Sequence, residues 1–335
     1  MVKLAINGFG RIGKQFFLAC MENSVASKWE FVINNLGGME NMVYELKYDS
    51  VHPSPKEKIT HDKKYLYFGK KKIMIYSERD VEKLPWKAEN VDLVVDCTGA
   101  FTNAKEAKKH LQSGAKKVLI SAPAKDHDCT IVYGVNNKVL KATHKILSAG
   151  SCTTNCVAPI IKIINDNYGI KDAYFVTTHA YTATQRLVDS IDEKDLRRGR
   201  AAAEDIIPST SGASQSVVEA IPEMLGKLEG YALRVPVLDG SFSSVIAVIK
   251  SKTTKEKINS LFKKESKGKY KEILQYTTDP IVSSDIIHNP SSCIIDGEIT
   301  STSKDGSMIS IGAWYDNEWG YSNRLVDVAK LIVGK

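Results

Sequence analysis

The chain lacks any long hydrophobic segment. No apolar run in its 335 residues approaches the roughly 18 residues that a membrane-spanning helix requires. The N-terminus passes from Met1 directly into motif sequence, without the apolar region or cleavage site of a signal peptide. We therefore expect a cytoplasmic protein that does not enter a membrane.

Cysteine is also scarce. Six cysteines in a chain of this length do not make the disulfide framework of a small secreted domain. Cys152 and Cys156 lie one helical turn apart, and we interpret the cysteines as reduced thiols. Neither the cysteines nor the seven histidines show the spacing of a zinc site, so no metal is expected.

The charge is only mildly unbalanced, with a formal net charge of +7. Such a surface attracts anions in general, nucleic acids and phosphorylated metabolites included. The lysines are scattered along the chain, however, and we interpret their short runs as solvated surface. Nucleic-acid binding is therefore permitted by the charge but not indicated by it.

Strand and helix patterns alternate through the first half of the chain. Strands are predicted at residues 4–7, 31–34, 91–96 and 117–121, and helices at 11–21, 39–48 and 103–113. Strands separated by helices of about ten residues predict βαβ units and a parallel sheet. Two shorter strand patterns, at 65–68 and 72–76, flank Gly69 and predict a hairpin.

The pattern changes near residue 150. Longer strands are predicted at 173–178, 231–237, 243–249 and 308–315, with amphipathic helices such as 255–264 between them. These features indicate an α+β half with an antiparallel or mixed sheet, and a length of 335 residues favours two domains. The stretch 180–203 is expected to be a long functional loop, and periodicity assigns the helix at 320–331 to neither half.

A glycine-rich motif follows the first predicted strand. Gly8-Phe9-Gly10-Arg11-Ile12-Gly13 matches G-x-G-x-x-G between a strand and a helix. Gly8 permits a tight turn, Gly10 lets a pyrophosphate approach the backbone, and Gly13 lets helix and strand pack closely. The alternative is a glycine turn that binds nothing. The context favours an α/β fold whose N-terminal domain is a Rossmann-like NAD(P)-binding domain, followed by the α+β domain as the catalytic one.

The second predicted strand ends in Asn34-Asn35, where such domains carry an acidic residue for the adenosine ribose. Asparagine can bond a ribose hydroxyl but lacks the charge that repels a 2′-phosphate. We therefore expect NAD to bind, with weaker exclusion of NADP. The alternative is that this segment is simply a turn.

The stretch Ser151-Cys152-Thr153-Thr154-Asn155-Cys156 is the main candidate for chemistry. Cys152 opens a predicted helix, where amide groups and the helix dipole favour a thiolate, and His179 on the next strand can accept its proton. Each residue has an alternative interpretation when taken alone. Cys152 could be a buried structural thiol, and His179 could be a hydrogen-bonded polar residue at the end of a strand. Beside a nicotinamide-binding half, the pair indicates aldehyde oxidation through a cysteine hemithioacetal and thioester, with the Cys152 N–H meeting the oxyanion.

Several stretches together resemble the phosphorylating glyceraldehyde-3-phosphate dehydrogenases over the full length of the chain. They are residues 6–13, 46–50, 121–123, 151–156, 234–236 and 314–318. The resemblance implies reversible oxidative phosphorylation of D-glyceraldehyde 3-phosphate to 1,3-bisphosphoglycerate, in glycolysis or gluconeogenesis. It also implies a homotetramer in which the loop 180–203 reaches toward a neighbouring cofactor site.

The resemblance further implies the roles of individual residues. Cys152 would be the nucleophile and His179 its base. The substrate phosphate would bind Thr182, Arg197 and Arg234, and the attacking phosphate Ser151, Thr153 and Gly212, next to Ser211, which stands in place of a common threonine. The expected cofactor contacts are Gly8, Gly10, Arg11, Ile12, Gly13, Asn35, Arg79, Ser121 and Asn317, the last holding the nicotinamide amide. The expected domains are 1–151 and 152–316, with 317–335 packing back on the N-terminal domain.

Two departures from the family pattern concern the cofactor. Asn35 replaces the usual aspartate, and Ser190-Ile191 stands where strictly NAD-dependent members commonly carry Leu-Pro. Both favour relaxed discrimination against NADP. Two alternative functions are an erythrose-4-phosphate dehydrogenase, and a non-catalytic RNA-binding or scaffold protein on the same fold, against which the intact Cys152, His179 and Arg234 argue.

Overall fold

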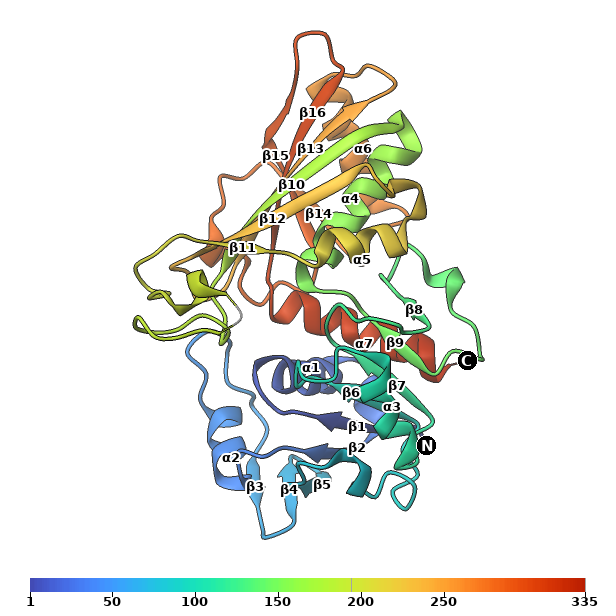
Figure 1. The fold of residues 1–335 in the computed structure, drawn as a ribbon, viewed down its shortest axis with the longest axis vertical. Helices are drawn as coiled ribbons and strands as arrows, with labels where there is room; N and C mark the ends of the chain where they lie inside the picture. The colour runs from blue at the N-terminus through green and yellow to red at the C-terminus, as the bar shows by residue number, and fades with distance from the viewer. Residues whose placement is uncertain (194, 335) are drawn as a thin grey trace. The chain divides into compact units, whose positions relative to one another are not determined.

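The computed structural model describes residues 1–193 and 195–334. The chain forms two compact units (Figure 1). The first unit comprises residues 1–131, 137–150 and the C-terminal residues from Ser322 onward. The second unit comprises residues 132–136 and 151–321.

A nine-stranded sheet organises the first unit, in the order β3-β4-β5-β2-β1-β6-β7-β9-β8. Its strands are β1 (Lys3–Asn7), β2 (Glu30–Asn34), β3 (Ile59–His61), β4 (Tyr65–Phe68), β5 (Lys71–Tyr76), β6 (Leu93–Asp96), β7 (Lys117–Ile120), β8 (Cys129–Thr130) and β9 (Ile146–Ser148). The pairs from β5 through β2, β1, β6 and β7 to β9 and β8 are parallel. The predicted hairpin is confirmed, since β4 pairs antiparallel with both β3 and β5.

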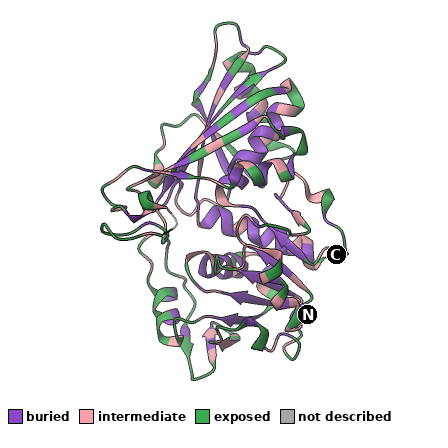
Figure 2. Cartoon of the chain, viewed as in Figure 1, coloured by how far each residue is buried: buried purple, intermediate pink, exposed green. Residues whose placement is uncertain are grey.

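The central strands of this sheet are buried along most of their length (Figure 2). Helices α1 (Arg11–Glu22), α2 (Met39–Lys47) and α3 (Ala104–Gln112) belong to this unit, as does α7 (Trp319–Val333) from Ser322 onward. Strands buried on both faces carry continuous apolar runs, which is how β1 and β6 were recognisable. Because β1 lies between β2 and β6, the strand order reverses there, and such a switch point is where dinucleotides bind.

A seven-stranded sheet organises the second unit, in the order β11-β12-β10-β13-β16-β15-β14. The strands are β10 (Ile170–Ala180), β11 (Ile207–Thr210), β12 (Leu228–Val235), β13 (Ser241–Ile249), β14 (Leu274–Thr277), β15 (Cys293–Thr302) and β16 (Met308–Tyr315). Only β10–β12 and β14–β15 pair in parallel, and the remaining neighbours are antiparallel. The predicted mixed, mostly antiparallel sheet is confirmed.

Helices α4 (Cys152–Tyr168), α5 (Ala213–Ala220) and α6 (Lys255–Lys267) complete the second unit. Helix α4 packs against β10, β13, β15 and β16, and its isoleucines join the core beneath the sheet. Along most of β13 each inward residue is buried and the next lies half-buried or exposed, as expected for a sheet with one covered face. This packing holds the first turn of α4 over the ends of the strands that carry the candidate site.

The sequence patterns missed several elements of the second unit, notably β11, β14, β15 and α5. In β15 the register shifts between Asp296 and Ser301, so the apolar alternation is interrupted. The predicted long loop is largely irregular: between β10 and β11 the described residues hold one 3₁₀ turn, Leu196–Gly199, and one isolated bridge between Arg186 and Ala201. Residue 194 of this loop lies outside the described residues.

Candidate active site

Helix α4 begins at the candidate nucleophile. Ser151 caps the helix, because its Oγ accepts a hydrogen bond from the Thr154 N–H at 3.1 Å. In return the Ser151 N–H donates to Thr154 Oγ1 at 3.1 Å. This capping box fixes the helix start. Cys152 is therefore the first helical residue, where the N–H groups of the first turn and the helix dipole favour a thiolate.

The Cys152 thiol lies beside the His179 imidazole. The Cys152 Sγ and His179 Nε2 atoms are 3.2 Å apart. His179 stands one residue before the end of β10 and is buried, whereas Cys152 is half-buried. The structure thus confirms that the predicted nucleophile and base are in contact, at a distance suited to proton transfer.

Two groups approach the other ring nitrogen of His179. Nδ1 lies 2.7 Å from the carbonyl oxygen of Ala180 and 2.6 Å from Arg234 Nη1. A carbonyl only accepts and a guanidinium only donates, so the two contacts suit different tautomers. When Nδ1–H donates to Ala180, Nε2 accepts from the thiol. When Arg234 donates to Nδ1, Nε2 carries the hydrogen and faces a thiolate, so the site accommodates the proton on either partner.

The electrostatics keep the imidazole uncharged. Burial, followed by the positive charge of Arg234, lowers the pKa of His179 to about 3. Burial raises the pKa of the Cys152 thiol above its usual value, and the positive charge of Arg234 and the N–H and hydroxyl of Thr153 offset only part of this rise. A neutral imidazole at neutral pH is able to accept a proton, which is what a general base requires.

A buried hydroxyl cluster behind the imidazole was not predicted from the sequence. Tyr315 Oη lies 3.0 Å from Thr153 Oγ1 and 2.7 Å from Thr177 Oγ1. The Tyr315 ring meets the His179 ring edge-on, with centroids 5.9 Å apart. Burial strongly raises the pKa of Tyr315, so the phenol stays neutral. Tyr315 lies within the recognised stretch 314–318, but no role of its own was predicted for it, and the pairing of β13 with β16 brings it here.

The other predicted phosphate ligands lie on segments that flank this centre. Thr182 follows β10, and its N–H donates to Gln185 Oε1 at 2.9 Å. Arg197 is the second residue of the 3₁₀ turn in the long loop, and its N–H donates to Oδ1 of the capping residue Asp195 at 3.0 Å. Ser211 and Gly212 stand between β11 and α5, and Gly212 is the N-cap of α5. Only Arg234 among the predicted phosphate-binding side chains has a described hydrogen bond with His179.

The glycine motif of the first unit forms a cradle that fits a pyrophosphate. Gly8 has a φ of +88°, which other residues rarely adopt. A Cβ on Gly13 would collide with the Gly8 carbonyl oxygen, so α1 packs tightly on the turn. A Cβ on Gly10 would meet nothing within 4 Å, which leaves open space before the N-terminus of α1. These are the three properties that the motif is expected to supply.

The remaining predicted cofactor residues of the first unit lie at or beyond the carboxyl ends of its strands. Asn35 follows β2, and its Oδ1 accepts from the Phe9 N–H of the glycine loop at 3.3 Å. Arg11 pairs with Asp49, with Nη1 and Oδ2 2.7 Å apart. Ile12 lies in the first turn of α1, Arg79 follows β5 and is exposed, and Ser121 follows β7. Asn317 belongs to the second unit, where its Oδ1 accepts from Ser241 Oγ at 2.6 Å.

Among the described residues, no helix combines the length and the apolar character needed to cross a bilayer.

Comparison with known proteins agrees with this geometry. Residues 2–104 match the family model "Glyceraldehyde 3-phosphate dehydrogenase, NAD binding domain", and residues 151–317 match its C-terminal domain. The chain is 45% identical over 332 residues to "Glyceraldehyde-3-phosphate dehydrogenase 2" of Streptomyces avermitilis, covering 99% of this chain and 98% of that protein. It is 43% identical over 335 residues to "Glyceraldehyde-3-phosphate dehydrogenase 1" of Bacillus subtilis, covering 100% and 99%. The chain therefore belongs to the glyceraldehyde-3-phosphate dehydrogenase family.

Proposed function

We propose that the chain catalyses the reversible oxidative phosphorylation of D-glyceraldehyde 3-phosphate to 1,3-bisphosphoglycerate with NAD as the oxidant. The observation that carries the proposal is the 3.2 Å contact between Cys152 Sγ and His179 Nε2 at the start of α4. A thiol in contact with a neutral base, at a helix start, is the arrangement needed to attack an aldehyde.

The chain's own residues account for the covalent steps. The Cys152 sulfur forms a bond to the aldehyde carbon, and the carbonyl π electrons move to oxygen, which the N–H of Cys152 stabilises. His179 first accepts the thiol proton and gives it to that oxygen, then removes it as the carbonyl re-forms. When bound, NAD supplies the acceptor for the departing hydride. The thioester on Cys152 is finally attacked by a phosphate oxygen, and the carbon–sulfur bond breaks to release the acyl phosphate and the Cys152 thiolate.

Two sets of donors would hold the two phosphates. Arg234, with Thr182 and Arg197, would bind the substrate phosphate, and a half-buried guanidinium beside His179 supports this role. Ser151, Thr153, Ser211 and Gly212 would bind the attacking phosphate, since they supply hydroxyls and N–H groups at the starts of α4 and α5.

NAD is the expected cofactor, and NADP is expected to be accepted less well. Gly8, Gly10 and Gly13 would cradle the pyrophosphate, with Arg11, Ile12, Arg79 and Ser121 as further contacts, and Asn317 would hold the nicotinamide amide. Asn35 is uncharged, and because its Oδ1 is bound to Phe9 its Nδ2 is the group able to face a ligand. A donor at this position does not repel a 2′-phosphate as a carboxylate would.

We further propose that the protein is a homotetramer in the cytoplasm. The face of the second unit's sheet away from α4 exposes apolar side chains, among them Tyr174 (45%), Ile246 (40%) and Met308 (45%). The long loop exposes Leu187, Val188, Ile191 and Leu196 in the same way. Apolar surface of this kind supports association between subunits, and a catalytic thiol is best preserved in a reducing compartment.

Initial rates would test the proposal. We expect NADH formation from glyceraldehyde 3-phosphate to depend on inorganic phosphate, to exceed the rate with NADP, and to exceed the rate with erythrose 4-phosphate. Cys152→Ser should abolish turnover. Turnover indifferent to inorganic phosphate would reject the phosphorylating assignment, and a principal activity that survives Cys152→Ser would favour a binding or scaffold role.

A further inference from the structure

A row of buried polar side chains borders the glycine motif of the first unit. Asn34, Asn7 and Asp96 are the last residues of the neighbouring strands β2, β1 and β6, and they are partners in the register of the parallel sheet. Partners in register point to the same face of a sheet, so these side chains meet. Each follows three buried apolar residues and is itself buried, so each requires hydrogen-bond partners inside the unit.

Hydrogen bonds join the row from end to end. Asn34 Nδ2 donates to Asn7 Oδ1 at 2.8 Å, and Asn7 Nδ2 donates to Asp96 Oδ2 at 2.7 Å. Asp96 Oδ1 accepts both the N–H and the hydroxyl of Thr98, at 3.1 Å and 2.7 Å. The Asp96 carboxylate therefore binds the end of β1 and the turn after β6 together.

His110 of α3 approaches the same carboxylate. The indole Nε1 of Trp86 lies 3.1 Å from His110 Nδ1, and an indole N–H only donates. His110 Nδ1 is therefore an acceptor, and a neutral ring carries its hydrogen on Nε2, 3.3 Å from Asp96 Oδ2. Both rings are fully buried, which restricts their orientation. Asp96 thus faces four donors, and an ionised carboxylate, which only accepts, satisfies all of them.

The partners of Asp96 enclose the turn at Gly8. Asn7 directly precedes Gly8 in the chain. Thr98 packs against the α-carbon of Gly8, where an added Cβ would lie 2.8 Å from Thr98 Cγ2 and 3.0 Å from the Thr98 nitrogen. One carboxylate therefore holds two residues that determine the shape of the glycine cradle.

The other end of the row holds the chain next to Arg79. Asn34 Nδ2 donates to the Glu78 carbonyl oxygen, and Asn34 Oδ1 accepts the Glu78 N–H, each at 2.9 Å. Arg79 is the next residue and an expected cofactor contact. The row therefore connects the glycine loop with a second segment that is expected to bind the cofactor.

We propose that Asp96 and His110 are positioning residues for the cofactor: His110 orients the Asp96 carboxylate, and this carboxylate keeps the glycine cradle in the shape that a pyrophosphate needs. The inference rests on the proposed binding of NAD by the glycine motif. Both side chains are buried, so they act through the backbone of the glycine loop and not through contact with NAD.

One substitution and a matched control test the carboxylate. Asp96→Asn keeps the side-chain shape but turns one acceptor atom into a donor, which then faces other donors. The control is Asp92→Asn. Asp92 directly precedes β6 and accepts the N–H of Lys3, the first residue of β1, at 2.9 Å. It therefore joins the same two strands at their opposite ends, away from the glycine motif.

A second pair of variants tests the imidazole. His110→Leu removes both ring nitrogens, whereas His110→Gln retains an N–H donor that is able to reach Asp96. This pair carries the test by itself if Asp96→Asn does not fold. Gly10→Ala, which fills the cradle directly, gives the scale of the effect.

The readouts are the Kd for NAD from equilibrium titration of the full-length protein, kcat, the KM for NAD, and the thermal midpoint. Because hydrogen bonds to a charged group are lost, Asp96→Asn and His110→Leu should raise Kd and KM by about tenfold or more, with a smaller change in kcat. His110→Gln should restore both to within about threefold of wild type. Asp92→Asn should also stay within about threefold, whatever its thermal midpoint.

The outcomes separate the positioning role from the proposed function. If Gly10→Ala weakens NAD binding but Asp96→Asn and His110→Leu do not, the positioning role is overturned and the proposed function stands. Equal weakening by Asp92→Asn also overturns it, since the effect would then come from the strand pair as a whole. If His110→Gln is as impaired as His110→Leu, the orienting role of His110 is overturned. If Gly10→Ala leaves NAD binding intact, the proposed cradle fails, and the positioning role fails with it.

Discussion

Two glycines of one motif should respond differently to the same added methyl group. In Gly13→Ala the new Cβ would collide with the Gly8 carbonyl oxygen, which belongs to the backbone and cannot rotate away. In Gly10→Ala the new Cβ would meet nothing within 4 Å, and the φ of Gly10 is −77°, which alanine adopts without strain. One substitution therefore tests packing between helix and turn, and the other tests the space reserved for the cofactor.

The magnitudes follow from these environments. Overpacking of this kind costs about 1–3 kcal/mol, and a loss of about 2 kcal/mol lowers the thermal midpoint by about 4–8 °C in a unit of this size. Gly10 is the N-cap of α1, where alanine costs less than about 1 kcal/mol relative to glycine. We therefore expect Gly10→Ala to unfold within a few degrees of wild type.

The assay is thermal unfolding of the protein without cofactor, combined with equilibrium titration of NAD. Both variants should bind NAD at least about tenfold more weakly. Gly13→Ala changes the shape of the pyrophosphate cradle, and Gly10→Ala fills part of it. A wild-type thermal midpoint for Gly13→Ala, or equal destabilisation of the two variants, would refute this account of the motif.

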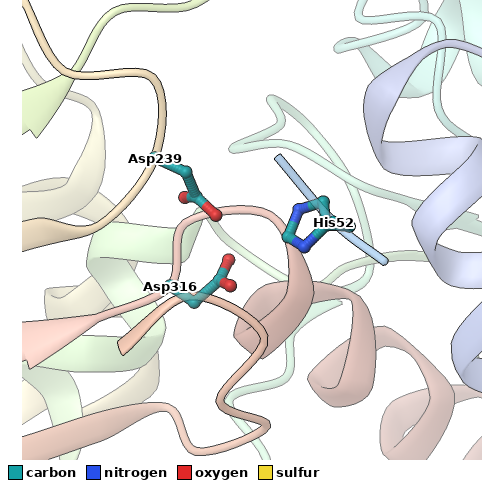
Figure 3. A group of neighbouring side chains, drawn as sticks. All are labelled: His52, Asp239 and Asp316. Carbon is teal, nitrogen blue, oxygen red and sulfur yellow. The ribbon is translucent and has the colours of Figure 1, made fainter. Parts of the chain in front are cut away.

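Three further predictions concern the second unit. His179→Asn should lower kcat by about 10²–10⁴-fold while Cys152 stays intact, because the general base is lost; initial rates measure this, and a loss below tenfold would contradict it. Tyr315→Phe removes the hydroxyl between Thr153 and Thr177 and should cost about 1–3 kcal/mol in chemical denaturation. The control is Tyr67→Phe, which removes an exposed hydrogen bond from the Tyr67 hydroxyl to Asp62 and should cost less than about 1 kcal/mol. Asp239 lies in the turn between β12 and β13, close to Asp316 (Figure 3), and burial, followed by the charges of Asp316 and Glu318, raises its pKa to about 9. The folded state therefore keeps a proton that the unfolded state releases, and the contribution of this group to stability falls as pH rises toward 9, by at most about 1.4 kcal/mol per pH unit. Denaturation at pH 6, 7 and 8 should show a flatter dependence for Asp239→Asn, and parallel curves would argue against the retained proton.

Local patterns predicted the elements whose signals lie within a few residues. The alternation of short apolar strands and helices gave the parallel sheet of the first unit, because each strand buried on both faces carries an unbroken apolar run. Strand β15 was missed because its register shift interrupts the alternation of apolar and polar residues by which a strand is recognised. Helix α5 was missed because it is only eight residues long and Val217 and Val218 are its only large apolar residues.

The residues of the candidate site were also predictable where they lie close together in the sequence, and not where they lie far apart. Cys152 and its cap lie within one turn of chain, and the motif around them is recognisable by itself. The contacts that tune the pair come from far away: Arg234 reaches His179 across 55 positions, and Tyr315 reaches Thr153 across 162. Such partners are fixed by strand order and register, which single-residue patterns do not encode. The raised pKa of Asp239 was not predicted for the same reason, since burial in the folded chain and the distant charges of Asp316 and Glu318 cause it.

The Ser151 hydroxyl at the start of α4 has two roles, as the cap of the helix and as a proposed phosphate ligand. Ser151 Oγ stands 2.9 Å from Thr154 Oγ1 while it accepts the Thr154 N–H, and the same oxygen is a proposed phosphate ligand. The Ser151 hydroxyl hydrogen could be donated to an arriving anion while the Ser151 Oγ still accepts the Thr154 N–H. A substitution of Ser151 therefore changes phosphate affinity and folding stability together. Ser151→Ala should lower both.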